Sequence, residues 1–68
     1  MNIITRLPAK PNPKLFNGNL YIEIYSFASC HYARLVDDMG FVHKDNIGYN
    51  HTSNTYQDAL KFAYKYQL

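Results

Sequence analysis

The sequence predicts an α+β fold, in which three antiparallel strands form a meander and one C-terminal helix packs on one face of the sheet. Two segments, 20–28 and 31–37, alternate apolar and polar side chains as half-buried strands do. A glycine-containing loop follows the second segment and is typical of a tight hairpin. The segment 55–68 has the spacing of an amphipathic helix. Whether the N-terminal residues add a fourth strand is left open.

Residues 1–14 are expected to form a proline-rich, partly flexible arm, and residues 15–68 a single β-β-β-α domain. Positions 8–13 hold three prolines, which fix φ and push the preceding residues toward extended geometry. Residues 2–7 either add an edge strand or stay disordered. The arm carries three basic residues and no acid, so it is a candidate phosphate or partner contact through Arg6, Lys10 and Lys14.

Asn17-Gly18 marks a turn before the first strand, because both residues tolerate positive φ. That strand covers 20–28, and Ser29-Cys30 interrupts the alternation before the second strand at 31–37.

The loop Asp38-Met39-Gly40 fits a three-residue hairpin connection, with Gly40 in the left-handed position of a type I turn plus bulge. The third strand then runs from Phe41 to about Ile47. In this register Phe41 lies on the core face, while Lys44 shares the opposite face with Arg34.

The final segment begins with a capping-box pattern, in which Thr55 caps the helix and Asp58 reaches back toward it. Small Ala59 and Ala63 on the inward arc allow the helix to lie close to the sheet, and Lys61 lies on the outer arc with Lys65. The predicted core consists of Ile22, Ile24, Ala33, Leu35 and Phe41 against Ala59, Leu60, Phe62 and Ala63.

Sixty-eight residues make one small domain, close to the lower size at which a core holds without staples. The single cysteine excludes an internal disulfide, and no segment reads as a signal peptide or a membrane span. We therefore expect a cytoplasmic protein. The net charge of +2 comes from the arm, because the rest of the chain is nearly neutral.

A sheet covered by a helix on one side leaves its other face free, and the alternation places aromatic and basic side chains there. Tyrosine and arginine are favoured where proteins bind partners, although the β-propensity of tyrosine alone also accounts for the pattern. The candidate partner-binding residues are Tyr21, Tyr25, Phe27, Tyr32, Arg34 and Lys44.

No catalytic or cofactor motif is present. Cys30, His31, His43 and His51 match no zinc spacing, and adjacent Cys30 and His31 point to opposite faces of a strand. We expect no metal, cofactor, catalytic residue or small-molecule substrate.

A rhythm of strand, Asp-containing turn, strand and alanine-rich helix is present in the stretches Tyr32-Ala33-Arg34-Leu35-Val36-Asp37, Gly40, Ile47-Gly48-Tyr49 and Tyr56-Gln57-Asp58-Ala59-Leu60. This rhythm resembles that of AP2-like DNA-binding domains and of the arm-binding domains of phage integrases. It covers about half of the chain. The resemblance implies a three-stranded sheet with a helix, and a sheet face that binds DNA, where Arg34 and Lys44 hold the comparable places.

In size the chain is also similar to small accessory proteins of phages and mobile elements, many of which bind a host enzyme stoichiometrically, as inhibitors of CRISPR complexes do. We expect a non-catalytic binding module, and this similarity implies that it binds a host protein in the bacterial cytoplasm. Two alternatives stay open: a nucleic-acid-binding module that uses the sheet and the arm, and a homodimer in which the aromatic faces meet.

Overall fold

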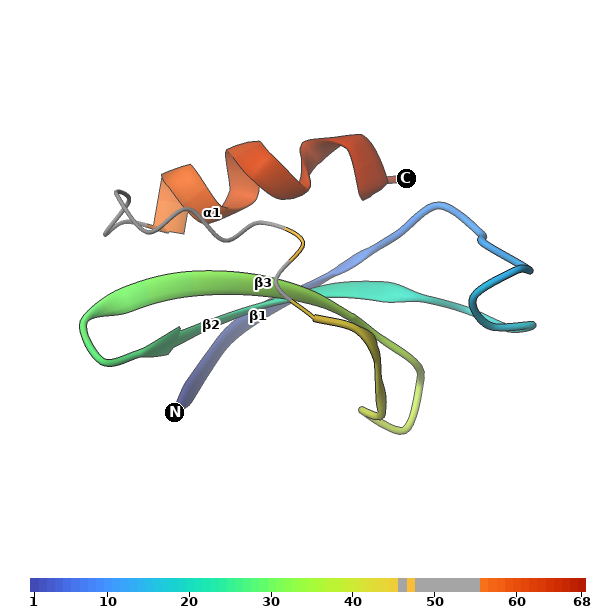
Figure 1. Cartoon of the computed structure of the whole chain (residues 1–68), viewed down its shortest axis with the longest axis horizontal. Helices are drawn as coiled ribbons and strands as arrows, with labels where there is room; N and C mark the ends of the chain where they lie inside the picture. Colours follow the sequence, from blue (N-terminus) through green and yellow to red (C-terminus); the bar gives the residue numbers. More distant parts are fainter. Residues whose placement is uncertain (46, 48–55) are drawn as a thin grey trace.

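The computed structural model has two layers, a four-stranded antiparallel sheet and a helix that crosses one of its faces (Figure 1). The strands lie side by side in chain order, and the α+β class predicted from the sequence is confirmed. The structure describes residues 1–45, 47 and 56–68. Predictions that concern Tyr49, His51, Thr55 and the side chains of Asp58 and Phe62 lie outside the described residues. The elements are β1 (Asn2–Pro8), β2 (Tyr21–Phe27), β3 (Cys30–Val36), β4 (Val42–Lys44), α1 (Tyr56–Ala63) and a 3₁₀ turn, η1 (Tyr64–Tyr66).

The N-terminal residues form the fourth strand that the sequence left open. β1 pairs antiparallel with β2, and Arg6 lies opposite Glu23. Beyond β1, the backbone N–H of Lys10 donates to Tyr66 O at 2.8 Å and that of Leu68 to Pro8 O at 3.1 Å. The expected boundary between residues 14 and 15 therefore does not mark the edge of the sheet, because β1 belongs to it.

The chain bends at Asn17-Gly18 as expected, but Gly18 does not have positive φ. A Cβ at Gly18 would come 2.6 Å from the Phe16 ring, so close approach is what requires glycine here.

β2 and β3 form a hairpin with an unbroken register from Tyr21 opposite Val36 to Phe27 opposite Cys30. The two connecting residues, Ala28 and Ser29, have φ of 52° and 64°. Two consecutive residues with positive φ are typical of a type I′ turn, which matches the twist of the flanking strands. The turn thus lies one residue earlier than the Ser29-Cys30 interruption predicted from the sequence.

The β3–β4 connection has the predicted geometry, with Gly40 at φ +87°. Phe41 O accepts from the N–H of Asp37, and Asp37 O from the N–H of Gly40, each at 3.0 Å. The register then shifts between Leu35 and Val36, so β4 carries one extra residue. Two expectations are wrong. Phe41 lies before the bulge and opposite Asp37, but it is beyond the core and 67% exposed. The bulge between Val42 and Lys44 reverses the alternation of faces, so Lys44 lies opposite Leu35 on the helix side.

The core fills the space between the sheet and α1. The side chains of Ile22 and Ile24 on β2 and of Ala33 and Leu35 on β3 are buried there. Ala59 and Ala63 are fully buried on the inward side of α1, which allows close packing, whereas Lys61 and Lys65 are exposed as expected.

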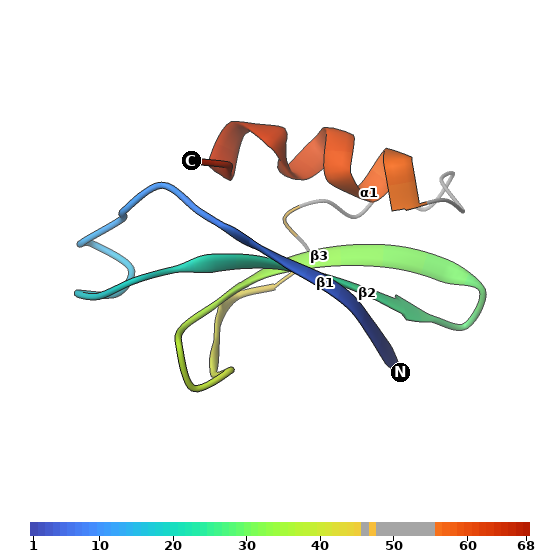
Figure 2. The same cartoon turned by 180° about the vertical axis from the view of Figure 1, so that it is seen from behind.

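The sheet is twisted, and two of its corners turn away from the helix: the N-terminal end of β1 and the loop of residues 37–41 (Figures 1 and 2). The loop of residues 37–41 also reaches back toward β1, because a Cβ at Gly40 would lie 3.7 Å from Arg6 Nη2. No helix in the described part of the chain has the length and apolar character needed to cross a membrane.

Candidate functional site

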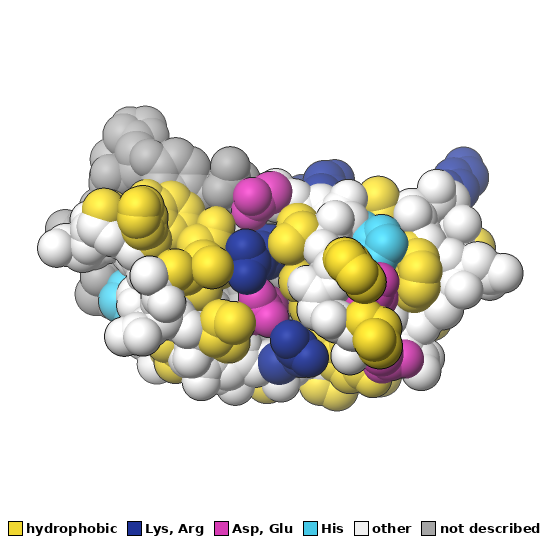
Figure 3. Space-filling model, turned by 90° about the horizontal axis from the view of Figure 1, so that it is seen from below, with side chains coloured by type: hydrophobic (Ala, Val, Ile, Leu, Met, Phe, Trp, Pro, Cys, Tyr) yellow, Lys and Arg dark blue, Asp and Glu magenta, His cyan; other side chains and the backbone are white. Residues whose placement is uncertain are grey.

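The sheet face turned away from α1, which we call the outer face, carries the candidate site. The register places Arg6 of β1, Glu23 of β2 and Arg34 of β3 side by side on it. Figure 3 shows this face with a row of alternating basic and acidic side chains across its middle and hydrophobic side chains at both ends. The outer face also carries Ile3, Tyr21, Tyr25, Phe27, Tyr32, Val36 and Val42.

The charged row runs across all four strands. Arg6 Nη2 donates to Glu23 Oε2 at 2.8 Å, and Arg34 Nε donates to Glu23 Oε1 at 2.8 Å. Asp45, the residue after β4, reaches the same face, since the Tyr25 hydroxyl donates to its Oδ1 at 3.3 Å. Along the row the side-chain charges therefore alternate: Arg6 is positive, Glu23 negative, Arg34 positive and Asp45 negative.

Glu23 is only 1% exposed although no helix or strand covers it. Burial alone would raise the pKa of its carboxyl group, but hydrogen bonds from Arg6 and Arg34 and their charges outweigh burial and lower the pKa. Glu23 is thus held ionised between the two guanidinium groups, which orients both arginine side chains along the sheet.

Tyr25 lies on the outer face as predicted, yet it is only 8% exposed. Its ring stacks on Tyr32, with centroids 5.3 Å apart, and the Arg34 guanidinium lies 4.5 Å from the Tyr25 centroid. Burial and then the charge of Asp45 raise the pKa of Tyr25. The sequence thus assigned Tyr25 to the correct face, but its ring serves as a support for Arg34 and Tyr32.

The exposed apolar side chains gather at the two ends of the outer face. Phe27 is 54% exposed at the β2–β3 end, where Ile3 of β1 is also exposed. At the other end the loop of residues 37–41 carries Met39, which is 81% exposed, and Phe41. Sequence reasoning selected Phe27 and missed the others. The sequence signal for this end of the face was the presence of Met39 and Phe41 on either side of Gly40, because a tight loop does not require large apolar residues.

The Asp37 carboxylate holds this loop in place. Its Oδ1 accepts from the N–H of Met39 at 2.8 Å and of Phe41 at 3.1 Å, and its Oδ2 lies 2.8 Å from His43 Nε2. The His43 ring packs on Phe16, with centroids 4.2 Å apart. Hydrogen bonding by His43 and by the two backbone N–H groups lowers the pKa of Asp37. The apolar loop is therefore presented in a defined conformation.

The structure separates the other predicted residues. Tyr21 is on the outer face, and a hydrogen bond with Asp38 raises its pKa. Lys44 is on the opposite side, where its Nζ lies 5.4 Å from the Tyr66 ring centroid. Lys10 and Lys14 are exposed beyond β1, away from the row that contains Arg6.

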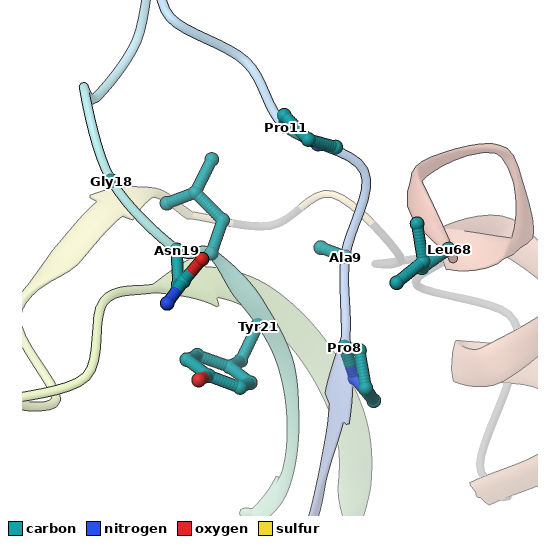
Figure 4. A pocket seen from close by; sticks show the side chains of 8 residues that line it. Pro8, Ala9, Pro11, Gly18, Asn19, Tyr21 and Leu68 are labelled. Carbon is teal, nitrogen blue, oxygen red and sulfur yellow. The ribbon is translucent and has the colours of Figure 1, made fainter.

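Figure 4 shows a shallow pocket where the end of β1 meets the start of β2, with the Tyr21 ring and the Asn19 side chain on one side and Leu68 on the other. Its volume of about 190 Å³ is below the roughly 300–1,000 Å³ that is usual for small-molecule sites. Among the residues that the structure describes, no three His, Cys, Asp or Glu side chains are grouped to hold a metal ion.

Comparison of the chain with protein-family models, with curated proteins and with solved structures gave no match. The site is therefore interpreted from its own geometry.

Proposed function

We propose that this chain is a non-catalytic binding module that binds a protein partner through the outer face. The observation that carries the proposal is the exposure of Phe27 at one end of the outer face and of Met39 and Phe41 in the loop at its other end, on either side of the ion-paired charged row. Exposed aromatic and methionine side chains beside ordered arginine are enriched where proteins bind each other.

A catalytic role has less support. Cys30 shares the face of Phe27 and His31 that of Ser26, so a Cys–His pair does not converge across the strand. The pocket at the end of β1 is shallow and carries only one titratable side chain, that of Tyr21, and a larger open hollow of about 410 Å³ at the β2–β3 turn carries only that of His31.

Nucleic-acid binding also has less support than protein binding. Arg6 and Arg34 both neutralise Glu23, and Lys44 lies on the helix side of the sheet. The clustered, uncompensated basic face that phosphate binding favours is thus not assembled from these three residues.

The size of the chain, similar to that of small phage and mobile-element proteins, extends the proposal to stoichiometric binding of a host protein in the bacterial cytoplasm, as an inhibitor acts. A surface of this kind blocks a partner by covering it and needs no chemistry of its own.

Affinity capture from a bacterial lysate, with and without nuclease, tests the proposal. We expect a nuclease-resistant protein partner, and we expect Phe27→Asp and Phe41→Asp each to weaken its capture by at least about tenfold. Tyr64→Asp is the matched control, because Tyr64 is an exposed aromatic residue that follows α1. Unchanged capture by both phenylalanine variants, or loss of all bound material on nuclease treatment, would contradict the proposal.

A further inference from the structure

The charged row has a property that bears on the identity of the partner: it is complementary to itself. Across β1, β2, β3 and the residue after β4 the charges alternate, from Arg6 through Glu23 and Arg34 to Asp45. A row with this alternation and an even number of charges matches its own reversed copy.

Two copies can face each other about a two-fold axis that lies between β2 and β3 and runs parallel to the strands. This operation places Arg6 of one copy opposite Asp45 of the other, and Glu23 opposite Arg34 of the other. The exposed charges of the row, those of Arg6 and Asp45, then meet opposite charges, whereas Glu23 stays buried at the centre of the row. The contact is isologous, as in most homodimers. An axis perpendicular to the strands would instead bring like charges together.

The same axis also matches the apolar parts of the face. It keeps each end of the face against the same end of the second copy, so the exposed Met39 and Phe41 of both copies lie at one end of the contact and the exposed Phe27 of both copies lies at the other. Apolar surface is thus buried against apolar surface.

We propose that the outer face binds a second copy of this chain, with the two charged rows paired in opposite order. The proposal rests on the proposed function, since it names an occupant for the same face. The Cα extents of 33 and 15 Å that bound this face outline about 500 Å² per copy, which is small for a stable interface of roughly 800 Å² per partner. We therefore expect a reversible dimer with micromolar affinity.

Two charge reversals test the pairing directly. Arg6→Glu alone places a second carboxylate opposite Asp45, and Asp45→Lys alone places an ammonium group opposite Arg6, twice in each symmetric dimer. Each variant by itself should raise the dimer dissociation constant by about tenfold or more. An equimolar mixture should recover dimers, because both cross-contacts are again between opposite charges. Analytical ultracentrifugation of wild type, each variant and the mixture at high micromolar concentration reads out mass against the 7.9 kDa of one chain.

Circular dichroism checks that each variant is folded, because Arg6 also pairs with Glu23 within the chain. If Arg6→Glu does not fold, Asp45→Lys and Phe41→Asp decide instead, since both positions are exposed. Lys61→Glu is the control, because Lys61 lies on the solvent-exposed side of α1, opposite the outer face of the sheet, and this variant should dimerise like wild type.

Wild type that stays monomeric at high micromolar concentration would overturn the dimer. So would a folded Asp45→Lys variant whose dimer dissociation constant is unchanged, or a mixture of the two folded variants that forms no more dimer than either variant alone. Monomeric wild type that still captures a foreign partner through Phe27 and Phe41 leaves the proposed function standing. Conversely, Asp45→Lys could weaken the dimer while Phe27→Asp and Phe41→Asp leave capture of a foreign partner unchanged. That result would contradict the proposed binding of a foreign partner and leave the dimer standing.

Discussion

Glu23 shows how one residue organises a surface. It lies in the middle of the outer face, and its carboxylate is buried by two arginines rather than by a core. Its ion pairs fix the Arg34 side chain, which in turn covers the Tyr25 ring. The charged row and the aromatic stack are therefore one connected unit.

Glu23→Gln should lower the free energy of unfolding by about 3 kcal/mol, because it leaves two guanidinium groups without their shared carboxylate in a partly buried place. Arg6→Gln is the matched control. The Arg6 side chain is 39% exposed, so its ion pair should be worth about 1 kcal/mol or less. Urea denaturation near neutral pH measures both values, and equal losses for the two variants would contradict the assignment of Glu23 as the centre of the row.

Acid should destabilise the protein through Glu23 and Asp37. Both pKa values are lower in the folded chain than their ordinary values of 4.5 and 3.8, so the unfolded state binds more protons at mildly acidic pH. The stabilisation is complete above the ordinary values and is lost as pH falls through the lower folded values. Denaturation curves across this acidic range should show it, and Glu23→Gln should flatten the dependence. A slope unchanged by that substitution would count against the ion pairs.

At the scale of elements, the two hairpin loops differ in how well their residues suit their backbone. Gly40 has the residue type that its positive φ favours, whereas Ala28 and Ser29 adopt positive φ with side chains that disfavour it. Asparagine and glycine are the preferred pair for a type I′ turn.

Replacing Ala28-Ser29 by Asn-Gly should therefore raise the free energy of unfolding by about 1 kcal/mol and raise the Tm. Gly40→Ala should lower it by about 1 kcal/mol, because a Cβ at φ +87° is strained although it meets only Arg6 Nη2, at 3.7 Å. Thermal denaturation of the two variants gives the comparison. A destabilised Asn-Gly variant would be incompatible with the turn described above.

The sequence predicted the elements from periodicity, and the failures have specific physical causes. Alternation in β2 assigns Ile22 and Glu23 to opposite faces, which the structure confirms. The bulge in β4 moves Lys44 to the helix side, and no composition signal marks it. The burial of Tyr25 depends on its cross-strand neighbours, Tyr32 and Arg34, so it requires the exact register.

At the scale of the whole molecule, the thin two-layer fold has no covering layer on its outer face among the residues that the structure describes. The chain orders that face internally with ion pairs and ring stacking and leaves apolar side chains exposed at both of its ends. Sequence reasoning found the face, whereas the exposed side chains at residues 37–41 follow from the curvature of the hairpin away from α1 (Figure 1).

Amide chemical-shift mapping by NMR tests most directly whether the outer face is the binding surface. Spectra are recorded as the chain is concentrated and as a captured partner is added. We predict that the shifts concentrate at Phe27, Arg34, Met39 and Phe41, while Lys61 and Lys65 on the helix side stay unchanged. Shifts centred on α1, with those four amides unaffected, would show that the molecule binds through its other side.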